Sequence, residues 1–150
     1  MDIDRNGLEV LSRPQCLALL AGASLGRVGV TVDALPVVLP VGFCLADDRI
    51  LIRTSPGTKL AAALRGSVVA FEADDVDPLY HAGWSVLVTG IARTAGEGEV
   101  APALDGARIP RWAPQGEDRV VAISTDVVTG RRLVAGRPPV IERTLHGARG

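Results

Sequence analysis

The sequence is poor in the residues that build metal centres, catalytic triads and disulfide frameworks. Among its 150 residues are two cysteines, two histidines and one lysine, and aromatic residues make up only 3%. Cys16 and Cys44 do not stand in a CxxC spacing, which argues against a zinc site and against a disulfide framework. No histidine pair has helical spacing and no Ser-His-Asp pattern is present, so hydrolase and zinc-enzyme functions lack support.

The sequence also lacks long apolar runs and a large net charge. No run approaches the ~20 residues that span a bilayer, and the N-terminus has no apolar core of signal-peptide length. The formal net charge is −1, which argues against broad electrostatic binding to nucleic acid. We therefore expect a soluble, cytoplasmic protein that binds neither membrane nor nucleic acid, with one domain over residues 1–136 and an arginine-rich, flexible tail over 137–150.

What the chain does have is a series of short segments with strand periodicity. Valines alternate in residues 27–32, and further strands are expected at 37–45, 49–54, 68–74, 83–94 and 119–124, with 127–134 either continuing the last strand or forming a seventh. Short helices are expected after Ser12, which has Gln15 at the capping-box spacing, and over residues 57–64. Tight turns at 33–36 and 47–48 and an acidic loop at 74–78 separate the strands. Short connections of this kind favour a mainly β fold whose antiparallel sheet closes on itself.

The segment RTSPGTKL, residues 53–60, follows an apolar strand and leads into a helix. Arg53 can make a forked contact to a phosphate, Thr54 and Thr58 offer hydroxyl donors, and Lys59 adds a mobile positive charge. An anion is stabilised where strand gives way to helix. The alternative from spacing alone is that Thr54 or Ser55 caps the helix while Arg53 and Lys59 are ordinary surface charges.

Several ordered motifs resemble one known family. RTSPGTKL after a strand, then AFEADD, GWSVLVTGIA, a Trp-Ala-Pro and a late VTGRRL are similar to the flavin-binding split-barrel, or pyridoxamine 5'-phosphate oxidase-like, proteins, and most of all to their small actinobacterial branch. The resemblance covers roughly residues 12–134. It implies a six-stranded antiparallel Greek-key barrel with short flanking helices, and a homodimer that binds FMN at the subunit interface.

The resemblance also implies residue roles. The FMN phosphate would be held by Arg53, Thr54, Thr58 and Lys59. The isoalloxazine ring would lie along residues 38–41, and further contacts would come from later segments. The implied residues beyond the phosphate corner are Val38, Pro40, Val41, Trp84, Ser85, Trp112 and Arg131.

One departure from the family pattern leaves alternatives open. Relatives often have an asparagine after Pro-Val in the second strand, and here Gly42 stands in its place. The resemblance favours an FMN-dependent oxidoreductase. An F420-dependent reductase, a haem or planar-ligand binding module without turnover, and a dimer with a decayed site are the open alternatives. No residue is assigned a catalytic role, and no metal site is expected.

Overall fold

The computed structural model describes residues 1–133, apart from residues 56, 97, 101–108 and 110–118 and the side chain of Lys59. Predictions for Trp112 and for the 137–150 tail therefore lie outside the described residues. The helices are α1 (Arg13–Ala21) and α2 (Lys59–Leu64). The strands are β1 (Asp2–Ile3), β2 (Glu9–Leu11), β3 (Leu25–Val32), β4 (Leu35–Ala46), β5 (Arg49–Thr54), β6 (Val68–Asp77), β7 (Ala82–Thr94), β8 (Arg119–Ile123) and β9 (Val127–Leu133).

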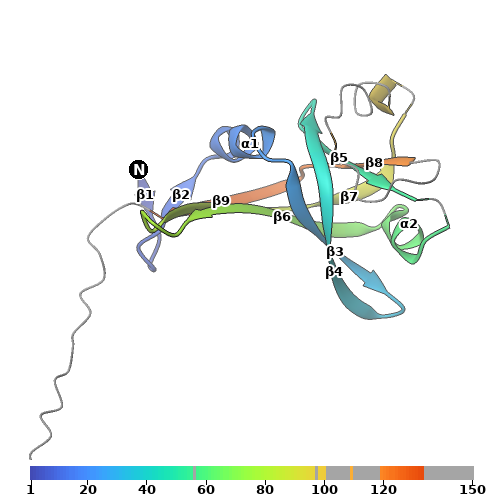
Figure 1. The fold of residues 1–150 in the computed structure, drawn as a ribbon, viewed down its shortest axis with the longest axis horizontal. Coiled ribbons are helices and arrows are strands. Elements are labelled where there is room, and N and C mark those ends of the chain that lie inside the picture. The colour runs from blue at the N-terminus through green and yellow to red at the C-terminus, as the bar shows by residue number, and fades with distance from the viewer. Residues whose placement is uncertain (56, 97, 101–108, 110–118, 134–150) are drawn as a thin grey trace, which may run out of the picture.

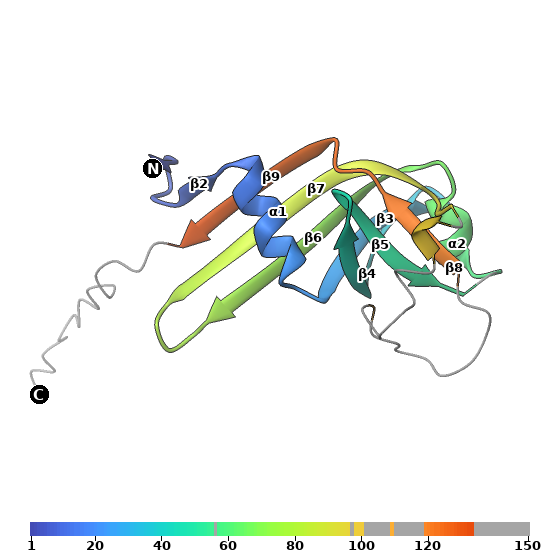
Figure 2. The ribbon, with the colours of Figure 1, turned by 90° about the horizontal axis from the view of Figure 1, so that it is seen from above.

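Six consecutive strands close into a barrel. The hydrogen-bonded order runs β7-β6-β3-β4-β5-β8, and β8 pairs back onto β7. Every strand pair is antiparallel, so the predicted mainly β split barrel is confirmed. Strand β9 pairs with the first half of β7 and carries β2 and β1 beyond the barrel. Figures 1 and 2 show β6, β7 and β9 as long neighbouring strands, with β5, β8 and α2 gathered at one end.

Buried and exposed residues alternate along β7, whereas β5 and β8 bury consecutive residues. In β7 the buried residues are Val86, Val88, Gly90 and Ala92, and the residues between them are exposed. Helix α1 lies over the same sheet face, where Cys16 and Leu20 are fully buried (Figure 2). The predicted capping box is present: the Ser12 hydroxyl accepts from the Gln15 amide, and the Gln15 side chain accepts from the Ser12 amide. Both cysteines are buried.

Two tight turns join β3, β4 and β5, as the sequence predicted. Asp33 and Ala34 have φ of +49° and +64°, and Asp47 and Asp48 have φ of +49° and +57°. Two successive left-handed residues are typical of the type I′ turn, whose twist matches that of the flanking strands. These turns fix the register of the barrel's central hairpins.

Strand β7 changes partner at Gly90. Before it, β7 pairs with β9 through Thr89; after it, β7 pairs with β8 from Ala92. Ser124 holds the junction, because its amide donates to the Ile91 carbonyl at 3.1 Å and its hydroxyl accepts from the Ile91 amide at 2.9 Å. A Cβ built on Gly90 would lie 1.7 Å from the Ser124 carbonyl oxygen. Only glycine fits here.

Three local predictions need correction. The acidic run at 74–78 was predicted as a loop, but its first four residues belong to strand β6. Asp74 to Asp77 pair with Ser85 to Ala82 of β7, and these four residues are exposed. The second helix begins at Lys59 and not at Gly57, which has φ of +80°. Strands β1 and β2 were not expected. Within the described residues, no helix is long and apolar enough to cross a membrane.

Candidate functional site

The corner between β5 and α2 is built by Thr58. Its Oγ1 accepts from the Ala61 amide at 3.1 Å and donates to the Ser55 carbonyl at 2.9 Å, which makes Thr58 the N-cap of α2. The prediction that Thr54 or Ser55 caps this helix is therefore wrong. A capping hydroxyl satisfies one of the free amides of the first turn. The Thr58 hydroxyl is already occupied in shaping the corner.

A pocket of about 180 Å³ opens beside this corner. It lies where β5 and β7 end and β8 begins, with α2 along one side, as the common end of these elements in Figure 1 shows. Buried Thr54 reaches it from β5. Its lining residues are Thr54, Gly57, Ala61, Leu64, Arg65, Arg93, Thr94, Arg119, Val120 and Val121. Three arginines and no acid stand among these described lining residues, so the pocket suits an anion.

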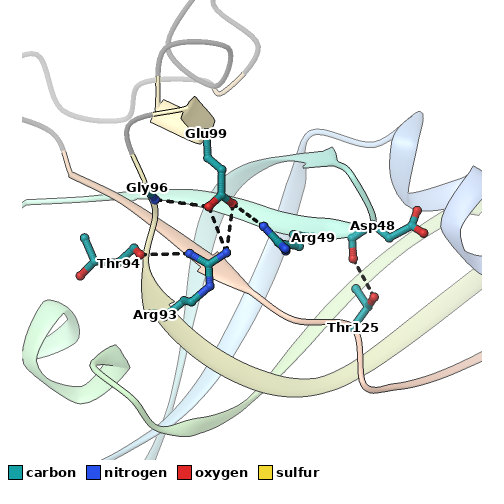
Figure 3. Close-up of polar contacts among 7 residues, drawn as sticks. All are labelled: Asp48, Arg49, Arg93, Thr94, Gly96, Glu99 and Thr125. Atoms are coloured by element: carbon teal, nitrogen blue, oxygen red, sulfur yellow. Dashed lines mark hydrogen bonds and ion pairs between the residues drawn. The ribbon is translucent and has the colours of Figure 1, made fainter.

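Glu99 holds one pocket arginine in place. Its carboxylate accepts from Arg93 Nη2 at 3.0 and 3.3 Å and from Arg49 Nη1 at 3.1 Å, and the Gly96 amide adds a further bond at 3.3 Å (Figure 3). Burial raises the pKa of Glu99, but hydrogen bonds from Arg93, Gly96 and Arg49 outweigh it, and the net effect lowers the pKa. Glu99 is thus ionised at neutral pH, and its two hydrogen bonds with Arg93 fix the position of that guanidinium group.

Of the four predicted phosphate-binding residues, the structure brings Thr54 to the pocket and Thr58 to its rim. Arg53 is partly buried, pairs with Val120, and lies on the β5 face opposite Thr54, since successive strand residues face opposite ways. Arg53 does not line this pocket. Lys59 is the first residue of α2, and its side chain lies outside the described residues. The predicted roles of Arg53 and Lys59 remain predictions.

The predicted ring-contacting residues lie on β4. Val38 and Pro40 are exposed on the outer face of the barrel, and Val41 is buried in the core with 6% exposure. From Leu35 to Gly42, β4 pairs only with β3 among the described strands, so Pro40, which has no amide hydrogen to donate, lies on an edge stretch. Val38 and Pro40 are accessible to a ligand or a partner, whereas Val41 packs in the core on the opposite face of the strand.

Trp84, Ser85 and Arg131 form a second group. In the β7–β9 ladder Ser85 faces Arg131, and Trp84 faces Arg132. Ser85 is exposed on the outer face, whereas Trp84 is half-buried and packs against the core. Arg131 binds the Asp4 carboxylate through Nε at 3.1 Å. This group is three strands from Val38, about 14 Å away or more at the usual strand spacing, so the two groups do not meet within one chain.

Sequence reasoning missed Arg65, Arg93, Arg119 and Glu99. The arginines come from three separate elements, and only the pairing of β8 with both β5 and β7 brings them together. Nothing in the sequence pattern distinguishes them from other arginines. The usable observation was their position at element ends: Arg65 caps α2, Arg93 lies one residue before the end of β7, and Arg119 begins β8.

An antiparallel barrel of six strands with short flanking helices defines a split-barrel protein. A family model described as pyridoxamine 5'-phosphate oxidase matches residues 12–132. The chain belongs to this family.

Individual proteins that are similar to this chain also support its membership of the family. A FAD-binding protein from Mycobacterium smegmatis has 37% sequence identity and a TM-score of 0.72, with 83% of this chain and 98% of that chain covered. An uncharacterised protein of Mycobacterium tuberculosis, Rv0080, is 41% identical over 130 residues, which is 83% of this chain and 85% of the relative. A FAD-binding protein from Mesorhizobium loti shares the fold at a TM-score of 0.73 and 20% identity, covering 84% and 98% of the two chains.

Proposed function

We propose that this protein is a homodimeric flavin-binding oxidoreductase whose cofactor lies at the interface between two copies. The observation that carries the proposal is the 37% identity to a FAD-binding protein over 83% of this chain, together with the arginine-lined corner. When bound, the flavin supplies hydride and electron transfer. The chain's own residues bind the anionic end, orient the ring and exclude water.

The residues of the corner fit a flavin nucleotide. The anionic end needs cationic donors and small residues that permit close approach, and the pocket offers three guanidinium groups beside Gly57 and Ala61. The apolar ring needs a flat surface, and Val38 and Pro40 present one on the outer face of β4. FMN is the cofactor that the sequence resemblance favours, and the similarity to a FAD-binding protein extends the choice to FAD.

The outer face of the sheet supports the second copy. Along neighbouring strands it exposes Val38, Val68, Leu87, Ile91 and Val127, each 47–70% accessible. Their positions share one face, because Gly29 pairs with both Val38 and Ala70, and Thr89 pairs with both Ala70 and Val127. The face also carries Thr89 and Glu72, which is opposite Leu87, but several large apolar side chains exposed on one face indicate a contact surface. A twofold-related copy of the same chain would cover it.

Dimerisation would also complete the site. Val38 and Pro40 lie on this outer face together with Ser85, but too far from it within one chain. In a twofold dimer, Ser85 of one copy can approach Val38 of the other. The two groups of predicted ring-contacting residues then become one site with walls from both copies.

The cofactor is tested by its spectrum. We expect the protein purified from its native host to show the absorption spectrum of an oxidised flavin, or to acquire it on titration with FMN or FAD. Protein that binds neither flavin refutes the proposal. Binding of F420 alone would instead indicate a deazaflavin reductase, and a Soret band on haem titration without NAD(P)H oxidation would indicate a haem-binding module.

The dimer is tested separately by size-exclusion chromatography with light scattering. We expect a dimer for the native protein and a monomer for Leu87→Arg, which replaces an exposed apolar side chain on this face by a charge. Leu79→Arg is the matched control, because Leu79 is 77% exposed at the β6–β7 turn and away from this face. A native protein that elutes as a monomer at all concentrations contradicts the shared site.

A further inference from the structure

The corner pocket holds more positive charge than one phosphate contact explains. Its guanidinium groups come from three elements: Arg65 follows α2, Arg93 lies on β7 and Arg119 begins β8. None of the three belongs to the RTSPGTKL segment from which a mononucleotide phosphate site was predicted. The pocket therefore needs a ligand group of its own.

The charges in the pocket are only partly neutralised. Arg93 shares Glu99 with Arg49, so one carboxylate serves two guanidinium groups. Among the described residues, neither Arg65 nor Arg119 makes an ion pair. The described charged residues that line the pocket are all arginines, and guanidinium groups bind phosphate oxygens with forked geometry.

The size of the pocket limits what it can hold. Its volume of about 180 Å³ is below the roughly 300–1,000 Å³ of sites that enclose a whole small molecule. A group the size of one or two phosphates fits, with the rest of the ligand outside. Gly57 leaves the entrance open, since a Cβ built there would meet nothing within 4 Å.

Thr54 connects this pocket to the predicted phosphate corner. It is the last residue of β5 and lines the pocket, and it is also one of the residues predicted to hold the ribityl phosphate. A ligand with one phosphate at the corner would leave the arginine side of the pocket unused. A ligand with two linked phosphates could place the second one there.

We propose that the pocket is a subsite for the second phosphate of a flavin dinucleotide, and that Arg65, Arg93 and Arg119 thereby select FAD over FMN. This inference rests on the proposed flavin binding.

The test is titration of the full-length protein and its variants with FAD and with FMN, followed by flavin fluorescence and calorimetry. Arg93→Gln and Arg119→Gln should each weaken FAD binding on the order of tenfold, because each removes charge-assisted hydrogen bonds, and should change FMN binding less than threefold. Arg49→Gln is the matched control, because it removes a guanidinium group that also binds the Glu99 carboxylate but that does not line the pocket. It should leave both affinities within threefold of the native protein.

The outcomes separate the inference from the proposed function. Equal weakening of FMN and FAD by the two variants would mean that the arginines hold the first phosphate, and it would overturn the inference. Unchanged FAD affinity in Arg93→Gln, Arg119→Gln and the double variant would overturn it as well. In both cases flavin binding by the native protein still stands, whereas a native protein that binds neither flavin fails at the proposed function itself. Circular dichroism of each variant confirms that the fold is retained.

Discussion

Replacing Gly90 with alanine should damage the barrel and the pocket together. Gly90 is the point at which β7 leaves β9 and joins β8, and the Ser124 carbonyl occupies the space where a side chain would be. Arg93 and Thr94, which line the pocket, lie three and four residues further along the same strand. A shift of the backbone at the junction is therefore passed directly to the pocket wall.

The magnitude follows from the contact. The new Cβ would lie 1.7 Å from the Ser124 oxygen, and real Cβ atoms essentially never approach within 3.0 Å, so the two backbones must separate by about 1.3 Å or more. Overpacking of this kind costs about 1–3 kcal/mol. The two hydrogen bonds between Ile91 and Ser124 contribute about 0.5–1.5 kcal/mol each and would be strained or lost. A total of about 2–6 kcal/mol corresponds to a fall in Tm of roughly 5–20 °C for a chain of this size.

The assay is thermal and urea unfolding followed by circular dichroism, with flavin titration of the folded variant. Gly29→Ala is the matched control, since Gly29 also lies inside a strand but its Cβ would meet Ala70 at an ordinary 3.5 Å. We expect that control to lie within about 2 °C of the native protein. A Gly90→Ala protein with native Tm would show that Ser124 can move without cost, and the account of the junction would be wrong.

Two further predictions concern ionisable groups. Burial and the neighbouring Asp74 carboxylate raise the pKa of Glu72 above its ordinary 4.5 despite the ion pair with Arg27, so the ionised carboxylate lowers the stability of the fold at pH 7. Glu72→Gln should therefore raise Tm at pH 7 by about 1–3 °C, and this gain should vanish below pH 4.5; a gain of the same size at every pH would contradict the raised pKa. Arg13 donates to the carbonyl and hydroxyl of buried Thr125 at 2.7 and 2.8 Å. Arg13→Met should therefore lower the free energy of unfolding, measured with urea, by about 1–3 kcal/mol. A loss below about 0.5 kcal/mol would show that these hydrogen bonds contribute no net stability.

The barrel was largely predictable because its strands obey period two. In residues 27–32 the valines alternate with other residues, and the structure buries Val28 and Val30; burial also alternates along β7, although its exposed set includes the apolar Leu87 and Ile91. Glu72 pairs with Arg27 across the sheet at 3.1 Å, as a cross-strand ion pair should. The acidic end of β6 was missed because its composition is typical of a loop, whereas the ladder with β7 supplies backbone hydrogen bonds that composition does not reveal.

The candidate site was only partly predictable. The corner at Thr54 and Thr58 is local in sequence, so its motif located it. The pocket arginines are 28 and 26 residues apart along the chain, from Arg65 to Arg93 and from Arg93 to Arg119, and they meet only through strand register. No local pattern encodes that register. The shared outer face with Val38 and Ser85 likewise depends on the order of strands between them.

The β3–β4 turn offers a practical route to a sturdier protein. Ala34 adopts a left-handed backbone without a polar side chain to compensate, and such a conformation costs a non-glycine residue about 1–2 kcal/mol. Ala34→Gly would create the Asp-Gly pair that two-residue hairpins favour. A protein that carries Ala34→Gly would start from a higher stability. Variants at the Gly90 junction and at the pocket, made in that protein, could then still be purified and titrated.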